Sequence, residues 1–183
     1  MGMYTGFRFK GIIKHKYRKD IYDVIYGNKE WKDCENNVFK EFSKIDRSLM
    51  LPNGRSAYLP DCWYKTENHF ESEATHGFEL YFNNITGLLC FQCEVKNYEP
   101  IDYFIKNVVP IICSKLIHCE SLYEENEVST LYKLLDGNTI KKDYGIRYED
   151  DECESIFPIQ KEEKEDKNIW YYNFKYDIEK DYR

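Results

Sequence analysis

The sequence predicts a single α+β domain in which helices pack mainly on one face of an antiparallel or mixed sheet. Residues 78–96 alternate between apolar and polar side chains, the period of two that is typical of strands. Residues 101–117 repeat apolar side chains at intervals of three and four, which indicates a helix with one buried face. The chain has 183 residues, 42% of them hydrophobic, so it is long enough to bury a core.

Within residues 78–96 the pattern predicts two strands joined by a turn. Residues 83–87 (Asn-Asn-Ile-Thr-Gly) favour chain reversal, because these residue types tolerate turn conformations. The second strand, 89–96, is expected to direct its apolar residues inward and Gln92, Glu94 and Lys96 outward. We therefore expect the second face of this sheet to contact water.

Elsewhere the same two periods predict strands over 4–17, 118–123 and 139–148 and helices over 18–26 and 30–45. Segment 129–135 fits either a short helix or a strand. Pro110 predicts a kink in helix 101–117, because proline lacks a donor and crowds the preceding turn. The order strand, helix, strand, strand, helix, strand is that of a ferredoxin-like fold.

Composition divides the chain into three parts. Residues 1–148 carry the predicted strands and helices and are expected to form the globular domain. Residues 149–168 are rich in charge and poor in apolar side chains, which predicts a solvated linker and an acidic C-terminal extension. Residues 169–183 form an aromatic segment that is expected to add an edge strand to the sheet.

Cysteine usage and the lack of long apolar runs bear on the compartment. No stretch approaches the roughly 18 apolar residues of a membrane span, and residues 1–9 do not resemble a signal peptide. The chain has seven cysteines, an odd number that favours reduced thiols over a disulfide framework. These observations predict a cytoplasmic protein that does not bind membranes.

Cys90 and Cys93 have the spacing of a redox or metal pair. The segment between them predicts a strand, in which residues three apart point to opposite faces, so the two sulfur atoms are not expected to converge. No second pair of cysteines or histidines at the usual spacing completes a zinc site. We expect no metal and no cofactor.

Catalytic pairs drawn from the cysteines and histidines lack a supporting motif. Cys62 with His69 or His76, and Cys113 or Cys119 with His118, combine a nucleophile with a base. Neither pair is accompanied by a glycine-rich elbow, and no glycine cluster precedes a helix to hold phosphate. The sequence leans against an enzyme without deciding the question.

A basic stripe on the first predicted strand is one candidate binding surface. It consists of Lys10, Lys14, Lys16 and Arg18, and long cations beside aromatic residues favour phosphate or base binding. This stripe supports an alternative function as a nucleotide- or RNA-binding protein or a small nucleotide-processing enzyme. The net charge of −7 opposes binding to nucleic acid.

The other candidate surface is acidic and carries a tyrosine. It consists of Glu120, Tyr123, Glu124, Glu125 and Glu127. Tyrosine offers apolar area at low entropic cost, and the surrounding carboxylates favour a basic partner protein. With no catalytic motif in the chain, we expect a non-catalytic inhibitor, immunity protein or anti-defence (anti-CRISPR-like) factor that occludes a basic site on its partner.

Overall fold

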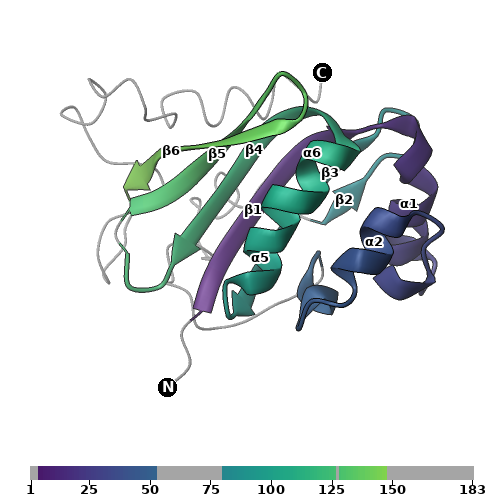
Figure 1. Ribbon diagram of the computed structural model, residues 1–183, viewed down its shortest axis with the longest axis horizontal. Helices are drawn as coiled ribbons and strands as arrows, with labels where there is room; N and C mark the ends of the chain where they lie inside the picture. The colour runs from purple at the N-terminus through teal and green to yellow at the C-terminus, as the bar shows by residue number, and fades with distance from the viewer. Residues whose placement is uncertain (1–3, 53–79, 127, 148–183) are drawn as a thin grey trace, which may run out of the picture.

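The computed structural model describes residues 4–52, 80–126 and 128–147, which form a six-stranded antiparallel sheet with helices packed on it (Figure 1). The strand order is β2-β3-β1-β4-β5-β6. The strands are β1 (Tyr4–Ile13), β2 (Tyr81–Phe82), β3 (Leu88–Lys96), β4 (Cys113–Tyr123), β5 (Val128–Leu135) and β6 (Thr139–Arg147). The helices are α1 (Arg18–Tyr26), α2 (Asn37–Phe42), α5 (Glu99–Tyr103) and α6 (Val109–Ile112). The predicted α+β class is confirmed.

Strand β1 lies at the centre of the sheet, between β3 and β4. Phe9 is opposite Phe91 on β3 and Cys119 on β4, so these residues share one face of the sheet, and in β4 the odd-numbered residues 119, 121 and 123 lie on it. The helices cover this face over β1 and β3, whereas β4, β5 and β6 extend beyond them (Figure 1). Part of the helical face is thus left without a helix on it.

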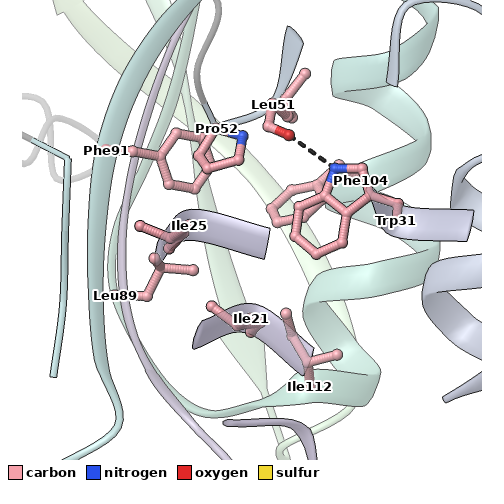
Figure 2. A pocket seen from close by; sticks show the side chains of 9 residues that line it. All are labelled: Ile21, Ile25, Trp31, Leu51, Pro52, Leu89, Phe91, Phe104 and Ile112. Carbon is pink, nitrogen blue, oxygen red and sulfur yellow. Dashed lines mark hydrogen bonds between the residues drawn. The ribbon is translucent and has the colours of Figure 1, made fainter. Parts of the chain in front are cut away.

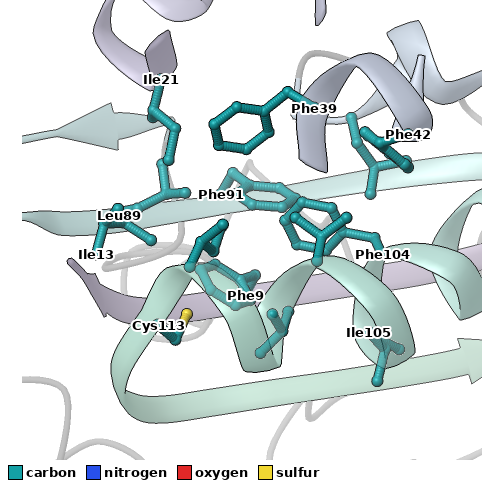
Figure 3. Packing of buried hydrophobic residues seen from close by; sticks show 14 of the residues in the cluster. Phe9, Ile13, Ile21, Phe39, Phe42, Leu89, Phe91, Phe104, Ile105 and Cys113 are labelled. Atoms are coloured by element: carbon teal, nitrogen blue, oxygen red, sulfur yellow. The ribbon is translucent and has the colours of Figure 1, made fainter. Parts of the chain in front are cut away.

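Aromatic side chains dominate the core between the sheet and the helices (Figure 3). Phe104 lies at its centre, with ring centroids 6.0 Å from Phe7, 5.7 Å from Phe9 and 5.4 Å from Phe42. Trp31 stacks on Phe39 at 5.1 Å. Edge-to-face and stacked ring pairs of this kind add to the stabilisation that comes from burial alone.

A small cavity of about 10 Å³ remains in this core (Figure 2). Its lining is apolar and includes Ile21, Leu89 and Phe104. Trp31 closes one side, where its Nε1 donates a hydrogen bond of 2.8 Å to the carbonyl oxygen of Leu51. Because a cavity of this size holds at most one water and offers few polar partners, we expect it to be dry.

The helix predicted over 101–117 ends earlier than expected. Helix α5 continues into a π-helical turn, Phe104–Val108, and then into α6, which ends at Ile112. Pro110 cannot donate to the carbonyl of Lys106 and its ring crowds that carbonyl, which accounts for the wider turn before it. The extension to Ile117 was wrong, because Cys113 already begins strand β4 and pairs with Ile13.

The structure agrees with the remaining predictions of secondary structure only in part. Helix 18–26 is confirmed as α1, and the ambiguous segment 129–135 is strand β5. The first strand ends at Ile13 instead of Tyr17, because residues 15–17 form a 3₁₀ turn. The helix predicted over 30–45 is divided into a 3₁₀ turn, Trp31–Asp33, and α2.

Several predictions concern residues outside the described ranges. These are the linker 149–168, the aromatic segment 169–183, and Cys62, His69, His76 and Glu127. Among the residues that are described, no helix is long and apolar enough to cross a membrane.

Candidate functional site

A polar groove lies on the helical face of the sheet, where β4, β5 and β6 extend beyond the helices. We call it the tyrosine groove, and its volume is about 310 Å³. Three tyrosines and a set of small polar residues form its lining, together with one lysine: Tyr98, Tyr123, Tyr132, Thr5, Ser121, Asn126, Thr130 and Lys142. The volume falls in the range of ligand pockets, and the polar lining distinguishes the groove from the dry core cavity.

The tyrosine groove is organised by a chain of three hydroxyl groups. The hydroxyls of Ser121 and Tyr132 lie 3.0 Å apart, and those of Tyr132 and Tyr98 lie 2.6 Å apart. Ser121 and Tyr132 come from paired strands, while Tyr98 directly precedes α5. This series of hydrogen-bonded hydroxyls therefore fixes the start of α5 against the sheet and holds two phenol rings in place.

The phenols of the groove are neutral at physiological pH. Burial raises the pKa of Tyr132 above its ordinary value. Burial also raises the pKa of Tyr98, although hydrogen bonds with Tyr132 and Ser121 act in the opposite direction. The pKa of Tyr123 is raised as well, first by desolvation and then by the negative charges of Glu125 and Glu124. The groove thus presents uncharged hydroxyls beside two carboxylates.

The acidic surface predicted from the sequence is only partly assembled. Tyr123 is half-buried and lines the groove, Glu124 is half-buried and Glu125 is exposed. Glu120, however, is 0% exposed, so the prediction that it lies on this surface was wrong. The physical reason is strand alternation: Glu120 and Tyr123 are three residues apart on β4 and point to opposite faces.

The sheet face opposite the helices carries a buried charged cluster, which we define as Arg8, Lys10, Glu94, His118 and Glu120. Arg8, Lys10, Glu94 and Glu120 are each 0% exposed, and His118 is 7% exposed. In the sheet register Arg8 lies opposite Glu120, and Lys10 lies opposite His118. The expectation that this face contacts water was wrong for these residues, including Glu94. Two cations and two carboxylates are present, so their charges can offset one another, as buried ions require.

Glu120 is the best-defined member of the buried charged cluster. Its Oε2 lies 2.9 Å from Nε2 of His118, and its Oε1 accepts a hydrogen bond of 2.6 Å from Ser129. Burial acts to raise the pKa of Glu120, but His118, Arg8 and Ser129 together lower it, so this side chain is held as a carboxylate. Ser129 donates to the carboxylate and not to the imidazole, whereas a serine nucleophile needs its hydroxyl on the base.

The basic stripe predicted on the first strand does not form a common surface. Lys10 is buried, while Lys14, Lys16 and Arg18 follow the end of β1 and therefore do not continue its alternation. Lys14 donates to the carbonyl oxygen of Ile111 at 2.9 Å, at the end of α6. Lys16 lies over the ring of Tyr17 at 4.7 Å. The placement of these side chains gives no support to a continuous phosphate site.

Arg18 makes hydrogen bonds within the fold and does not belong to an open binding surface. Its guanidinium donates hydrogen bonds to the carbonyl oxygens of Ile13 at 2.9 Å, Ile85 at 2.6 Å and Thr86 at 3.1 Å. These contacts join the end of β1 to the turn between β2 and β3. Gly87 has a φ of +82°, and a Cβ there would lie 2.6 Å from the Ile13 carbonyl oxygen. Arg18 therefore clamps the turn that the sequence predicted at 83–87.

We expect Arg18→Lys to lower the free energy of unfolding by about 1.5–3 kcal/mol, because an ammonium cannot reproduce the planar fork that reaches several carbonyls. Urea unfolding at pH 7 measures this change. Lys40→Gln, at an exposed position on α2, is the control and should change the value by less than about 0.5 kcal/mol. Equal stability of the two variants would contradict the clamp.

The cysteines of the described segments lie in the interior of the protein. Cys90 and Cys93 lie three residues apart on β3, and Cys113 and Cys119 lie in the core on the face opposite His118. All the cysteines described are free and buried. Burial raises the pKa of the Cys34 thiol to about 12, and it raises the pKa values of Cys93, Cys113 and Cys119 as well. Raised pKa values keep these four thiols protonated at neutral pH.

Within the ranges that the structure describes, no group of three or more histidine, cysteine, aspartate or glutamate side chains could hold a metal ion. No family of known proteins, no curated protein and no solved structure matches the chain. The described residues form an α+β protein with a polar groove on its sheet.

Sequence reasoning identified Tyr123 but missed Tyr98, Ser121 and Tyr132. Tyr98 is 34 residues from Tyr132 in the chain, and only the fold brings their hydroxyls together. One signal was available for the paired strands: a polar residue such as Ser121 and a tyrosine such as Tyr132 on an otherwise buried face need hydrogen-bond partners.

Proposed function

We propose that this protein is a non-catalytic binding protein that recognises a basic partner protein through the tyrosine groove and its acidic rim. The acidic rim is Glu124 and Glu125. The proposal includes a role as an inhibitor, immunity protein or anti-defence factor that occludes a basic site on the partner. It also includes a cytoplasmic location, which the free cysteines of the described residues support.

The observation that carries the proposal is the position of Tyr123. It lines a groove of about 310 Å³ and is followed directly by the two carboxylates of the acidic rim. Neither rim carboxylate forms an ion pair within the described segments. An aromatic anchor at a concave site with charges at its edge is the usual arrangement of a binding hot spot. The net charge of −7 adds long-range attraction for a basic partner.

We propose that β1 to β4, with α1 and α5, form the ferredoxin-like unit that the sequence predicted. Two observations support it: the strand order β2-β3-β1-β4, and antiparallel pairing of β1 with both β3 and β4. In this arrangement β5 and β6 are additions, and they supply Thr130, Tyr132 and Lys142 to the groove.

We expect Tyr123→Ala to weaken partner binding by about 2 kcal/mol or more, roughly thirtyfold, because a hot-spot aromatic loses its buried contact area. The wild-type protein and the variant are used as parallel baits in the native host, and the captured partner is then purified. Surface plasmon resonance measures its affinity over a range of salt concentrations. Association should slow as salt rises, since screening weakens the attraction of the acidic rim.

Tyr22→Ala is the matched control, because Tyr22 is 44% exposed on α1 and does not line the groove. It should retain the partner at wild-type affinity, and Glu125→Gln should cost less than Tyr123→Ala because a single rim charge contributes little. A partner that binds Tyr123→Ala as tightly as wild type would refute the groove as the interface. Recovery of no partner, together with hydrolysis of a nucleotide by the pure protein, would favour an enzyme.

A further inference from the structure

We propose that the tyrosine groove receives an arginine side chain of the partner protein. This inference rests on the proposed function, and it names the chemistry that the groove recognises. Three features of the groove carry it: an excess of hydrogen-bond acceptors, aromatic surface, and two carboxylates opposed by a single lysine.

The hydroxyl chain supplies the acceptors. Its two hydrogen bonds use two of the three hydroxyl hydrogens of Ser121, Tyr132 and Tyr98. One donor then remains against several unused lone pairs, because each hydroxyl accepts as well as donates. Thr5 and Thr130 add further hydroxyls to the lining. A guanidinium is all donor and no acceptor, so it matches this surplus.

Ring surface is the second feature. Tyr98, Tyr123 and Tyr132 all line the groove, and their phenols stay neutral at pH 7; Tyr98 and Tyr123 are half-buried and offer ring surface, whereas Tyr132 is 2% exposed. Arginine packs its planar head against aromatic rings more readily than lysine does, and a ring face attracts the cation in addition. The volume of about 310 Å³ falls in the range of ligand pockets and leaves room for a long side chain.

Charge at the groove is the third feature. Glu124 and Glu125 follow Tyr123 and carry two negative charges, whereas Lys142 is the one cation in the lining. Asp102 is also near Tyr98, but it forms an ion pair of 2.8 Å with Lys106, so the two charges offset each other. Among these described residues the two carboxylates that act on Tyr123 outnumber Lys142, which favours a cationic ligand. Lys142 is exposed at the groove and must turn aside when a second cation enters.

Substitution of Lys142 distinguishes a cationic ligand from an anionic one, because the two should change the binding affinity in opposite directions. If the ligand is cationic, Lys142→Met removes a repulsion and should strengthen binding by about two- to fivefold, the range expected for one exposed charge. If the ligand is anionic, the same variant should weaken binding. Lys141→Met is the matched control, because Lys141 is the exposed neighbour on β6 and does not line the groove.

The probe is a blocked Gly-Arg-Gly peptide, titrated into isotope-labelled protein and followed by amide chemical shifts. We expect shifts at Ser121, Asn126 and Thr130, tighter binding to Lys142→Met, and no change for Lys141→Met. A Gly-citrulline-Gly peptide, which keeps the shape without the charge, should bind more weakly. Absence of shifts with the arginine peptide would overturn the inference. So would stronger binding of Gly-Glu-Gly or inorganic phosphate that is lost in Lys142→Met.

The inference and the proposed function can fail separately. If a partner protein is captured and depends on Tyr123 but its affinity does not change in Lys142→Met, the arginine inference fails and the binding function stands. If the arginine peptide binds in the groove with the expected sign and no partner protein is captured, the proposed function fails and the chemistry of the groove stands.

Discussion

Glu120→Ala is expected to lower the free energy of unfolding by about 3–5 kcal/mol, because it removes one partner from a buried set of charges. Glu120 is 0% exposed, as is Arg8, which lies opposite it in the sheet register. The substitution also leaves His118 and Ser129 without the carboxylate oxygens that they contact at 2.9 Å and 2.6 Å. Urea unfolding at pH 7 measures the loss.

Acid should reduce the difference between the wild-type protein and Glu120→Ala. The pKa of Glu120 in the folded protein is lowered from the value of about 4.3 in the unfolded chain. The stabilisation by its carboxylate is therefore complete above about pH 5 and is lost as the pH falls through the lowered pKa. Unfolding measured at pH 7 and at about pH 3 tests this trend.

Glu125→Gln is the control for the same series, because Glu125 is an exposed carboxylate in the turn that follows β4. Its effect on stability should stay below about 0.5 kcal/mol. A loss of less than 1 kcal/mol in Glu120→Ala would mean that the buried charged cluster contributes little to the folded state.

Phe104→Ala is expected to cost about 3–5 kcal/mol and to lower Tm by roughly 2–4 °C for each kcal/mol. Phe104 is 2% exposed and contacts the rings of Phe7, Phe9, Phe42 and Phe91. Its removal takes one side from the existing cavity of about 10 Å³, which would grow by the volume of a ring (Figure 2). Thermal unfolding, followed by circular dichroism, gives the change in Tm.

A second measurement separates the enlarged cavity from general damage to the fold. An apolar cavity of this kind stays dry and binds small apolar molecules, so benzene or xenon should raise the Tm of Phe104→Ala and leave wild type unchanged. Ile85→Ala is the control, since Ile85 is 89% exposed and contributes little burial. Equal effects of Phe104→Ala and Ile85→Ala would contradict the central place of Phe104 in the core.

The elements with strong periodicity could be predicted from the sequence, and those decided by long-range pairing could not. Helix α1 matches its predicted bounds, because Gly27 ends an amphipathic segment that is read from local residues. The apolar stripe over 101–117 satisfies a helix as far as Ile117, yet residues 113–117 form the start of β4. Pairing with β1 decides this boundary, since residues 113, 115 and 116 pair with β1 although the register shifts twice.

The sequence by itself determined the α+β class, the alternation of faces along β1 and β3, and Tyr123 as a candidate for binding. It did not determine which faces are buried: alternation predicted a water-facing side for Arg8, Lys10 and Glu94, and only the tertiary structure placed them with Glu120 in the interior. The tyrosine groove was also decided by the fold, because Tyr98 and Tyr132 meet at 2.6 Å across a long separation in the chain. Local periodicity specifies on which side of a strand a side chain lies. Whether that side chain is buried, and whether two distant hydroxyls meet, depends on which other segments of the chain pack beside it.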